Sequence, residues 1–337
     1  MARPLRIQYP GAYYHVTCRG NERRAIFRDN ADRQKFLETL SLSLETYRVT
    51  LYVYVLMPNH FHLMVRTAEG NLSEFMRHFN ISYTMAFNRR HGRVGHLYQG
   101  RYKAFLVDSD SYLIELSRYV HSNPVHGDRF KDATIEEKWK YLWGYRESSL
   151  QGYLGIGKKQ QFVDYQEVLA HFGGDTRRGR DAYARFIVEG LEKKIRSPLE
   201  MGRGHGIVGE KEFIAWVKEK MVPEEKSRRE QPATRELGKR YSPKELIEQY
   251  CAIIGETRES LCRKGIQSTA RAMLMELLYR YCFLTQHEIG KLMGGIDYSA
   301  VSYARKKLRS KMREDRQLAK QFEEVSNRII EDSRLKI

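Results

Sequence analysis

Two histidines separated by one residue are the strongest chemical pattern in this chain. His60 and His62 flank Phe61 in a β-prone run, and residues two apart on a strand point to the same face. Neutral imidazole nitrogens at that spacing can bind one divalent cation together. The same spacing also fits two half-exposed strand residues, so the pair predicts a metal site only together with a further polar group.

A tyrosine and an asparagine supply such groups. Tyr119 and Asn123 are four residues apart on a predicted helix that Pro124 ends, which places both side chains on one helix face. A tyrosine hydroxyl attacks phosphorus once a nearby cation or base lowers the cost of deprotonation from its usual pKa of about 10, and an amide oxygen can complete a metal shell. Taken alone, the pattern favours a surface tyrosine at Tyr119 and a helix cap at Asn123. Tyr112 is a rival nucleophile two helical turns earlier, about 10 Å away.

The elements that must position these residues follow the order β-α-β-β-α-β-α. Alternating hydrophobicity and turn signals predict strands over 12–18, 51–57, 60–66 and 102–107. Helical spacing and caps predict helices over 30–47, 71–90 and 109–122. This order is typical of a ferredoxin-like antiparallel sheet, which we expect to carry its helices on one face. The predicted fold class is therefore α+β, with the catalytic domain over residues 1–150.

Three motifs in this region resemble one known family. They occupy residues 55–65 (VLMPNHFHLMV), 95–103 (GHLYQGRYK) and 118–125 (RYVHSNPV). In this order they are similar to the IS200-like single-tyrosine transposases with an HUH motif, and most of all to the branch of REP-associated tyrosine transposases. The resemblance extends over residues 5–150.

The resemblance implies a ferredoxin-like catalytic domain with a Mg²⁺ or Mn²⁺ site. His60 and His62 match the metal histidines of the family. Asn123 falls where the third polar ligand lies, a position at which some relatives carry glutamine, and Tyr119 matches the nucleophile. The implied chemistry is attack on a single-stranded DNA phosphodiester, which gives a 5′-phosphotyrosine link and a free 3′-hydroxyl without ATP.

The rest of the chain is predicted to be largely helical. We expect a connector over 151–241, an all-helical DNA-binding domain over 242–315 and a helical tail over 316–337. Within the DNA-binding domain, glycines separate helical stretches over 285–292 and 298–312, which is typical of a helix-turn-helix.

The second of these stretches carries polar residues followed by cations. Ser299 and Ser302 come first and suit contacts with base edges, whereas Arg305 and Lys306 follow and suit phosphates. A helical bundle with a solvated basic face is the alternative interpretation.

This C-terminal region resembles the DNA-binding domain of the replication initiator DnaA. The resemblance is carried by Glu288-Ile-Gly and by Gly294, Gly295, Asp297 and Val301. It implies contact between Arg271 and DNA. Ile296 and Tyr298 depart from the residues that DnaA has around the aspartate, so the box sequence that DnaA recognises is not transferred to this chain.

The charge balance favours a polyanionic partner. Lys+Arg number 59 against 42 Asp+Glu, which gives a net charge of +17 and a pI near 9.6. Nucleic acid relieves such an excess, although a basic housekeeping protein or a membrane-surface binder also fits charge alone. Arg101 and Lys103 are predicted to contact DNA, and Tyr98 and Tyr102 to stack on unpaired bases.

Several protein classes are not indicated. No apolar run approaches the roughly 18 residues of a membrane span, and the basic N-terminus lacks the apolar stretch of a signal peptide. The four cysteines form no C-x-x-C pair, and no nucleotide-binding G-x-x-x-x-G-K-[ST] stretch occurs. These absences predict a cytoplasmic, nucleoid-associated protein with free thiols.

Together these patterns predict an enzyme that cleaves and rejoins single-stranded or hairpin repeat DNA, as a monomer or a homodimer. One alternative is a non-catalytic, sequence-specific DNA-binding regulator derived from a transposase. Another is a metal-dependent phosphodiesterase that uses water as its nucleophile. A covalent DNA adduct would distinguish the enzyme from both alternatives.

Overall fold

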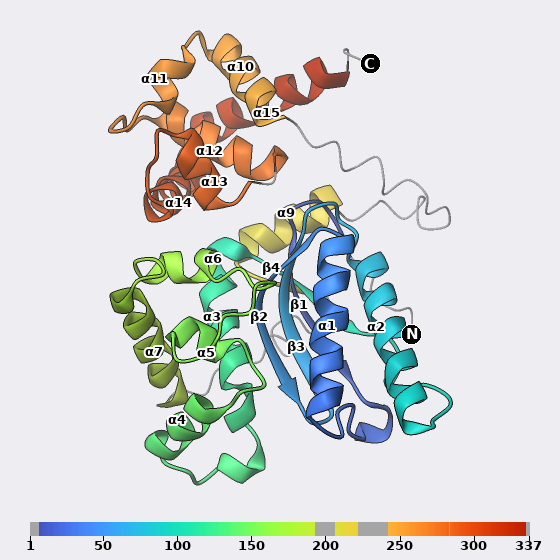
Figure 1. The fold of residues 1–337 in the computed structure, drawn as a ribbon. Helices are drawn as coiled ribbons and strands as arrows, with labels where there is room; N and C mark the ends of the chain where they lie inside the picture. The colour runs from blue at the N-terminus through green and yellow to red at the C-terminus, as the bar shows by residue number, and fades with distance from the viewer. Residues whose placement is uncertain (1–6, 193–205, 222–241, 283, 335–337) are drawn as a thin grey trace. The chain divides into compact units, whose positions relative to one another are not determined.

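The computed structural model describes residues 7–192, 206–221, 242–282 and 284–334. It contains two compact units, Met1–Gly238 and Lys239–Ile337, which Figure 1 shows in blue to yellow and in orange to red. The charge-rich part of the predicted connector, residues 222–241, and the end of the predicted tail, residues 335–337, lie outside the described residues. Among the described residues, no helix is both long and apolar enough to cross a membrane.

A five-stranded sheet organises the first unit. Its strands are β1 (Tyr13–Arg19), β2 (Val49–Met57), β3 (His60–Thr67), β4 (Lys103–Val107) and β5 (Ile207–Val208), in the order β2-β3-β1-β4-β5. Neighbours among the first four strands are antiparallel, whereas β5 pairs in parallel with β4. The four predicted strands are confirmed within two residues at each end. The two-residue strand β5 was not predicted.

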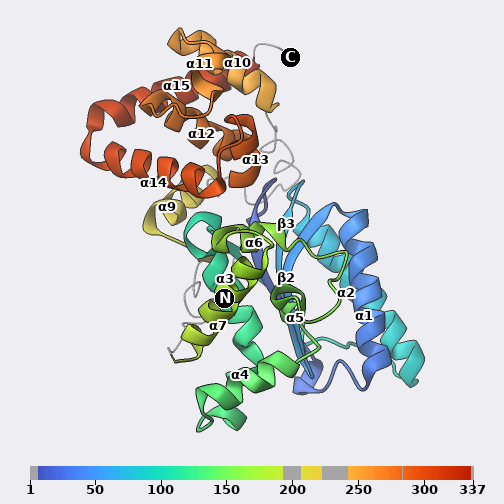
Figure 2. The ribbon, with the colours of Figure 1, turned by 60° about the vertical axis from the view of Figure 1, so that its left-hand side comes forward.

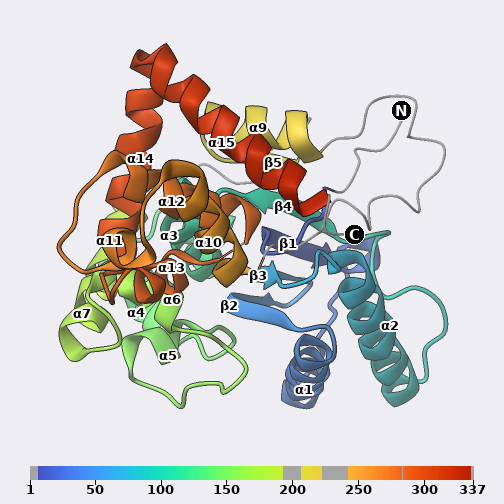
Figure 3. The same ribbon diagram turned by 90° about the horizontal axis from the view of Figure 1, so that it is seen from above.

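Helices cover both faces of this sheet, so the prediction that they lie on one face is wrong. The helices α1 (Asn30–Thr46) and α2 (Leu72–His91) lie on one face, and α3 (Ser109–Ser122) lies on the other (Figure 3). The physical reason is the continuous burial of the central strands, because Phe61, Leu63 and Met64 are all 0% exposed. A strand whose two faces are both apolar needs a covering layer on each side.

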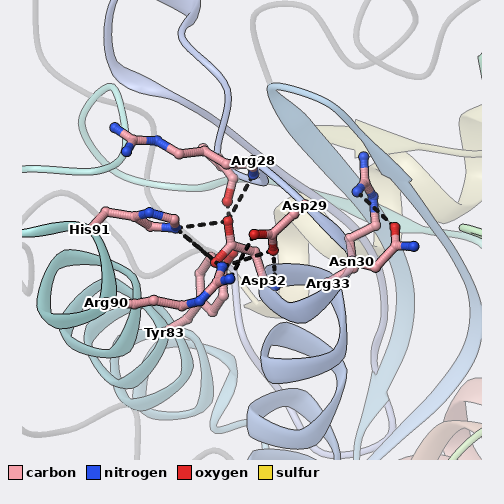
Figure 4. A network of polar contacts seen from close by, with 9 residues as sticks. Arg28, Asp29, Asn30, Asp32, Arg33, Tyr83, Arg90 and His91 are labelled. Carbon is pink, nitrogen blue, oxygen red and sulfur yellow. Dashed lines mark hydrogen bonds and ion pairs between the residues drawn. The ribbon is translucent and has the colours of Figure 1, made fainter.

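A polar network ties the start of α1 to the end of α2. Asp29 caps α1 by accepting a hydrogen bond from the backbone of Asp32. Arg90 donates to Asp29 at 2.6 Å and also pairs with Asp32, and His91 lies 2.9 Å from the same carboxylate (Figure 4). Asp32 is 2% exposed, so these partners supply the hydrogen bonds that a buried carboxylate requires.

Short helices after α3 belong to the first unit. They are α4 (Ile135–Gly144), α5 (Leu150–Leu154), α6 (Gln166–Leu169), α7 (Arg177–Glu192) and α9 (Lys211–Met221). The helices α3 and α7 lie side by side, with α5 next to α7 (Figure 2). Residues from the range 151–192, which was predicted to form part of a connector, therefore pack against the helix that carries Tyr119.

The second unit is all-helical, as predicted. It consists of α10 (Pro243–Ile254), α11 (Arg258–Cys262), α12 (Thr269–Tyr281), α13 (Gln286–Leu292), α14 (Tyr298–Glu314) and α15 (Arg316–Arg334). The helix α15 contributes Phe322, Val325 and Ile329 to the core of this unit. Residues from the predicted helical tail thus contribute to the core of this unit.

A glycine turn joins α13 to α14. The backbone N–H groups of Gly295 and Ile296 both donate to the carbonyl of Gly290, and Gly294 and Gly295 adopt positive φ angles of 81° and 73°. Asp297 then caps α14 by accepting from the backbone of Ser299 at 2.7 Å. Glycine at these positions and the aspartate cap explain why the second helix starts where the sequence predicts.

A buried ion pair holds α14 against α12. Arg305 is 0% exposed, Glu276 is 2% exposed, and the Arg305 Nε donates to Glu276 Oε2 at 2.9 Å. The guanidinium also lies 3.4 Å from the ring centroid of Tyr279. Burial opposes ionisation of Glu276, but the charges of Arg305 and Arg280 outweigh this and hold its pKa at about 2.

We predict that Glu276→Gln destabilises the second unit by about 3–5 kcal/mol, because it leaves the buried Arg305 cation without its counter-charge. Urea unfolding of the full chain by far-UV circular dichroism, with hydrogen exchange of the α12 and α14 amides, measures the effect. Glu248→Gln removes an exposed carboxylate from α10 and is the matched control. Equal stability of the two variants would contradict the structural role of this pair.

Candidate active site

His60 and His62 lie on one face of β3, as their spacing predicts. Their ring centroids are 5.1 Å apart; His62 is 3% exposed and His60 is half-buried. The Nδ1 atom of His60 lies 2.7 Å from the side-chain oxygen of Asn59, and that of His62 lies 2.8 Å from His15 Nε2. With the Nδ1 atom of His62 engaged by His15, its Nε2 atom is the nitrogen left for a cation.

The helix α3 brings Tyr119 and Asn123 to the same place. The ring of Tyr119 meets that of His62 nearly edge-on, with centroids 6.0 Å apart, and Asn123 makes a side-chain hydrogen bond with His60. Tyr119 is only 7% exposed. The structure therefore brings together the four residues that the sequence predicts as nucleophile and ligands, while their chemical roles stay predictions.

Sequence analysis missed two further residues beside this cluster. His15 on β1 is 0% exposed and stacks on His62 with an interplanar angle of 8°, and His126 lies 6.0 Å from the Tyr119 ring. A histidine at an inward position of a central strand was a visible signal for His15. The antiparallel register that brings it beside His62 was not visible, because it depends on pairing between distant segments.

Burial favours the neutral form of the histidines in this cluster. Burial lowers the pKa of His60 to about 4 and that of His15 to about 3. Burial likewise lowers the pKa of His62 well below its usual value, and the charges of neighbouring groups lower it further. Arg19 is the β1 residue opposite His60, and its positive charge contributes to lowering the pKa of both His60 and His62. Neutral imidazole is the form that binds cations.

This donor set fits a weakly held divalent cation. It comprises two imidazole nitrogens and the amide of Asn123. In the part of the chain that the structure describes, no group of three or more His, Cys, Asp and Glu side chains is placed to hold a metal. A structural zinc site is closed by four protein ligands, so the cluster instead fits a cation whose remaining positions are filled by water or by a phosphate.

A buried hydrogen-bond network fixes α3 in position. His121, two residues after Tyr119, places Nδ1 at 2.7 Å from the Tyr183 hydroxyl on α7 and Nε2 at 2.8 Å from Ser149 Oγ. Ser149 Oγ also accepts from the backbone N–H of Tyr54 on β2 at 3.0 Å. His121 is 0% exposed, so this network ties the helix that carries Tyr119 to both α7 and the sheet.

A close approach between α7 and α3 supports the same arrangement. Arg118 lies 4.2 Å from the ring centroid of Phe186 and donates to its carbonyl. A Cβ atom at Gly190 would come within 2.3 Å of the Arg118 side chain. Glycine at this position therefore allows α7 to pack directly on the helix that carries Tyr119.

Exposed arginine and lysine side chains occur near the end of the sheet that carries His60 and His62. Arg101 and Lys103 are exposed, as their predicted contact with DNA requires, and so are Arg19, Arg23 and Arg24. The loop that carries Arg101 is held to the end of β1, because Gln99 donates its backbone N–H to the carbonyl of Arg19. The strand register places Arg19 beside His60, and Lys103 beside Thr17, which is the partner of His62. Positive charge beside the cluster suits phosphates.

The expectation that Tyr98 and Tyr102 stack on bases is wrong for this structure. Each is only 7% exposed. Tyr98 packs edge-on against Phe61, and the Tyr102 hydroxyl lies 3.3 Å from Ser73 Oγ. Both rings contribute to the core, and a stacking platform needs an open ring face.

The residues of the second unit that were predicted to contact DNA differ in their exposure to solvent. Ser299 and Lys306 are exposed, and Ser302 is half-buried. Arg271, at 3% exposure, donates to the carbonyls of Leu261, Arg263 and Met293. Because Arg271 satisfies carbonyls at helix ends and Arg305 pairs with Glu276, neither guanidinium faces solvent, and this burial disagrees with their prediction as DNA contacts.

Comparison with known proteins agrees with the geometry of the first unit. Residues 8–123 match the family Transposase IS200 like. The match includes His60, His62, Tyr119 and Asn123 and ends at Asn123. Ser149 and the helix α7, which hold α3 through His121, lie beyond this matched region.

A solved structure is also similar to this chain. It is described as "Structure of the REP associates tyrosine transposase bound to a REP hairpin". The sequence identity is 15%, the match covers 49% of this chain and 94% of that one, and the TM-score is 0.37.

We predict that His121→Leu lowers the free energy of unfolding of the first unit by roughly 1–3 kcal/mol, because it removes two buried hydrogen bonds. Tryptophan fluorescence reports on this unit alone, since all three tryptophans lie in it. Hydrogen exchange should speed up in α3 and α7. The control is His96→Leu, which alters an exposed histidine. Unchanged hydrogen exchange in α3 of His121→Leu would contradict the proposed role of the His121 hydrogen bonds in holding this helix.

Proposed function

We propose that the first unit is a transposase-type enzyme that cleaves and rejoins single-stranded or hairpin DNA through Tyr119. The observation that supports this most is the contact of Tyr119 with His62 while Asn123 is hydrogen-bonded to His60. The IS200-like match over residues 8–123 includes the same four residues. A nucleophile, a pair of neutral imidazoles and an amide in one place suit phosphodiester chemistry.

In this proposal His60, His62 and Asn123 hold one Mg²⁺ or Mn²⁺ ion. When bound, such an ion polarises the scissile phosphate and stabilises charge on its oxygens. Arg19 adds a positive charge on the same side, opposite His60 across the strand pair. The fixed helix α3 holds the Tyr119 hydroxyl toward the group that it attacks, which reduces the entropy lost on reaching the transition state.

The reaction exchanges one ester bond for another. The Tyr119 oxygen bonds to phosphorus and its proton passes to water, while the bond from phosphorus to the 3′-oxygen breaks and that oxygen takes up a proton. The product is a 5′-phosphotyrosine link with a free 3′-hydroxyl. Because the link keeps the energy of the broken ester, a 3′-hydroxyl can later displace Tyr119 and rejoin the strand.

We further propose that the second unit binds duplex DNA through α14. The exposed residues Ser299 and Lys306, at the start and middle of a helix that follows a glycine turn, support this, as does the resemblance to the DnaA domain. A protein that used only this unit would be a DNA-binding regulator. The four-residue cluster in the first unit favours the enzyme over the regulator, because a regulator does not need it.

We predict that the full-length protein with Mn²⁺ forms a covalent adduct on single-stranded or hairpin DNA taken from the flanks of its gene, and none on a perfect duplex. The chain has no ATP-binding motif with which to open a duplex. Denaturing gel electrophoresis detects the adduct. Tyr119→Phe should abolish it with binding nearly unchanged, because only the nucleophilic oxygen is lost.

Tyr112→Phe is the matched control for this experiment. It removes a hydroxyl from the same helix, and burial already raises the pKa of Tyr112 to about 12. An adduct that vanishes in Tyr112→Phe and persists in Tyr119→Phe would overturn the assignment. Multiple-turnover hydrolysis without an adduct would instead indicate a water-dependent phosphodiesterase, and cleavage that survives EDTA would exclude the metal.

We predict that Lys306→Ala makes the affinity for duplex DNA less sensitive to salt. The slope of log K against log [salt] should become about 0.9 less negative, which is the value for one lost phosphate contact. Fluorescence anisotropy over a series of salt concentrations measures this slope for the full chain. Lys244→Ala removes an exposed lysine from α10 and should leave the slope unchanged. Identical slopes for the two variants would remove α14 from the DNA-binding surface.

A further inference from the structure

A buried histidine that the proposed chemistry does not use, His15, lies on β1 next to His62 of β3. His15 is 0% exposed, its Nε2 is 2.8 Å from the Nδ1 of His62, and the two rings are stacked with centroids 5.0 Å apart. The Tyr119 ring meets the His15 ring edge-on at 5.8 Å. His15 thus contacts both a predicted metal ligand and the predicted nucleophile.

The hydrogen bond between the two histidines has two possible directions. A neutral imidazole has one N–H and one bare nitrogen. If His15 donates from Nε2, then His62 accepts at Nδ1 and carries its own proton on Nε2, where it blocks a cation. If His62 donates from Nδ1, its Nε2 is bare and can bind a cation, while the proton of His15 lies on Nδ1.

We propose that His15 is a positioning residue that accepts the Nδ1 proton of His62 and so fixes the tautomer that can bind a cation. The inference rests on the metal site of the proposed function. Metal-ligating histidines commonly donate their second N–H to a carboxylate, a carbonyl or water. Here an uncharged imidazole takes that place, so the site gains no negative charge from the residue that orients its ligand.

The cation-binding tautomer leaves one buried N–H group of His15 without an acceptor. The Nδ1 atom of His15 is buried and has no hydrogen-bond partner. In the cation-binding tautomer this atom carries a proton, and a buried N–H without an acceptor is unfavourable. In the opposite tautomer the same atom is a bare nitrogen that is also buried without a partner, so this atom does not favour that tautomer. When a cation binds Nε2 of His62, both rings therefore adopt the cation-binding tautomer together.

The stacked pair also supports Tyr119. The Tyr119 ring stands nearly perpendicular to both histidine rings, at 80° to His15 and 82° to His62. Edge-to-face contacts of this kind favour one ring orientation. One residue thus orients the ligand through a hydrogen bond and the nucleophile through ring packing.

Two substitutions separate the hydrogen bond from the packing. His15→Phe keeps a flat ring of similar size and removes the acceptor, whereas His15→Gln replaces the ring and returns an acceptor at similar reach. We expect Mn²⁺ to bind His15→Phe about 10- to 100-fold more weakly than wild type, the range for loss of such a partner. His15→Gln should recover most of that loss. Electron paramagnetic resonance of free Mn²⁺, titrated against the full-length protein without DNA, measures the affinity.

Each outcome of this titration decides between the hypotheses. Wild-type affinity in His15→Phe overturns the positioning role, and so does equal weakening in both variants, because packing alone would then explain it. Tryptophan fluorescence during unfolding shows whether either variant is misfolded. If wild type and His62→Ala bind Mn²⁺ equally, the metal site itself fails, and the inference fails with it.

Discussion

The alternation of side chains along β3 is the constraint on which the rest of the first unit depends. Phe61 points into the layer of α1 and α2, where its ring contacts Phe36 and Phe79. His60 and His62 point to the opposite face and meet the residues of α3. A shift of register by one residue would exchange these two faces, so the core that packs around Phe61 also fixes the direction of the histidine pair.

The second requirement is a rigid support for α3, and it comes from a different part of the chain. The region of family similarity ends at Asn123, whereas Tyr183 and Ser149, which bind His121, lie beyond it. The helix that carries Tyr119 is thus held by residues outside the region that matches the family. Its position depends on buried polar groups, which are satisfied only in one arrangement.

The sequence predicted the order and the ends of the elements well, because alternation, caps and turn residues act locally. It also predicted that His60, His62, Tyr119 and Asn123 would meet. Two of the omissions have a common cause in long-range contacts. Neither the stacking of His15 on His62 nor the burial of Arg305 against Glu276 can be read from spacing, because each partner comes from a distant element. The apolar runs of the central strands did carry the signal for helices on both faces.

The ties between α3 and the rest of its own unit have a consequence for stoichiometry. His15, His60, His62, Tyr119 and Asn123 come from one chain and contact one another within it. Exchange of α3 alone between two copies would break the hydrogen bonds of His121 within one chain. It would also remove the close contact between Arg118 and Gly190. A single copy therefore brings together the groups to which the proposed reaction assigns roles, and on that proposal the rate would be first order in protein.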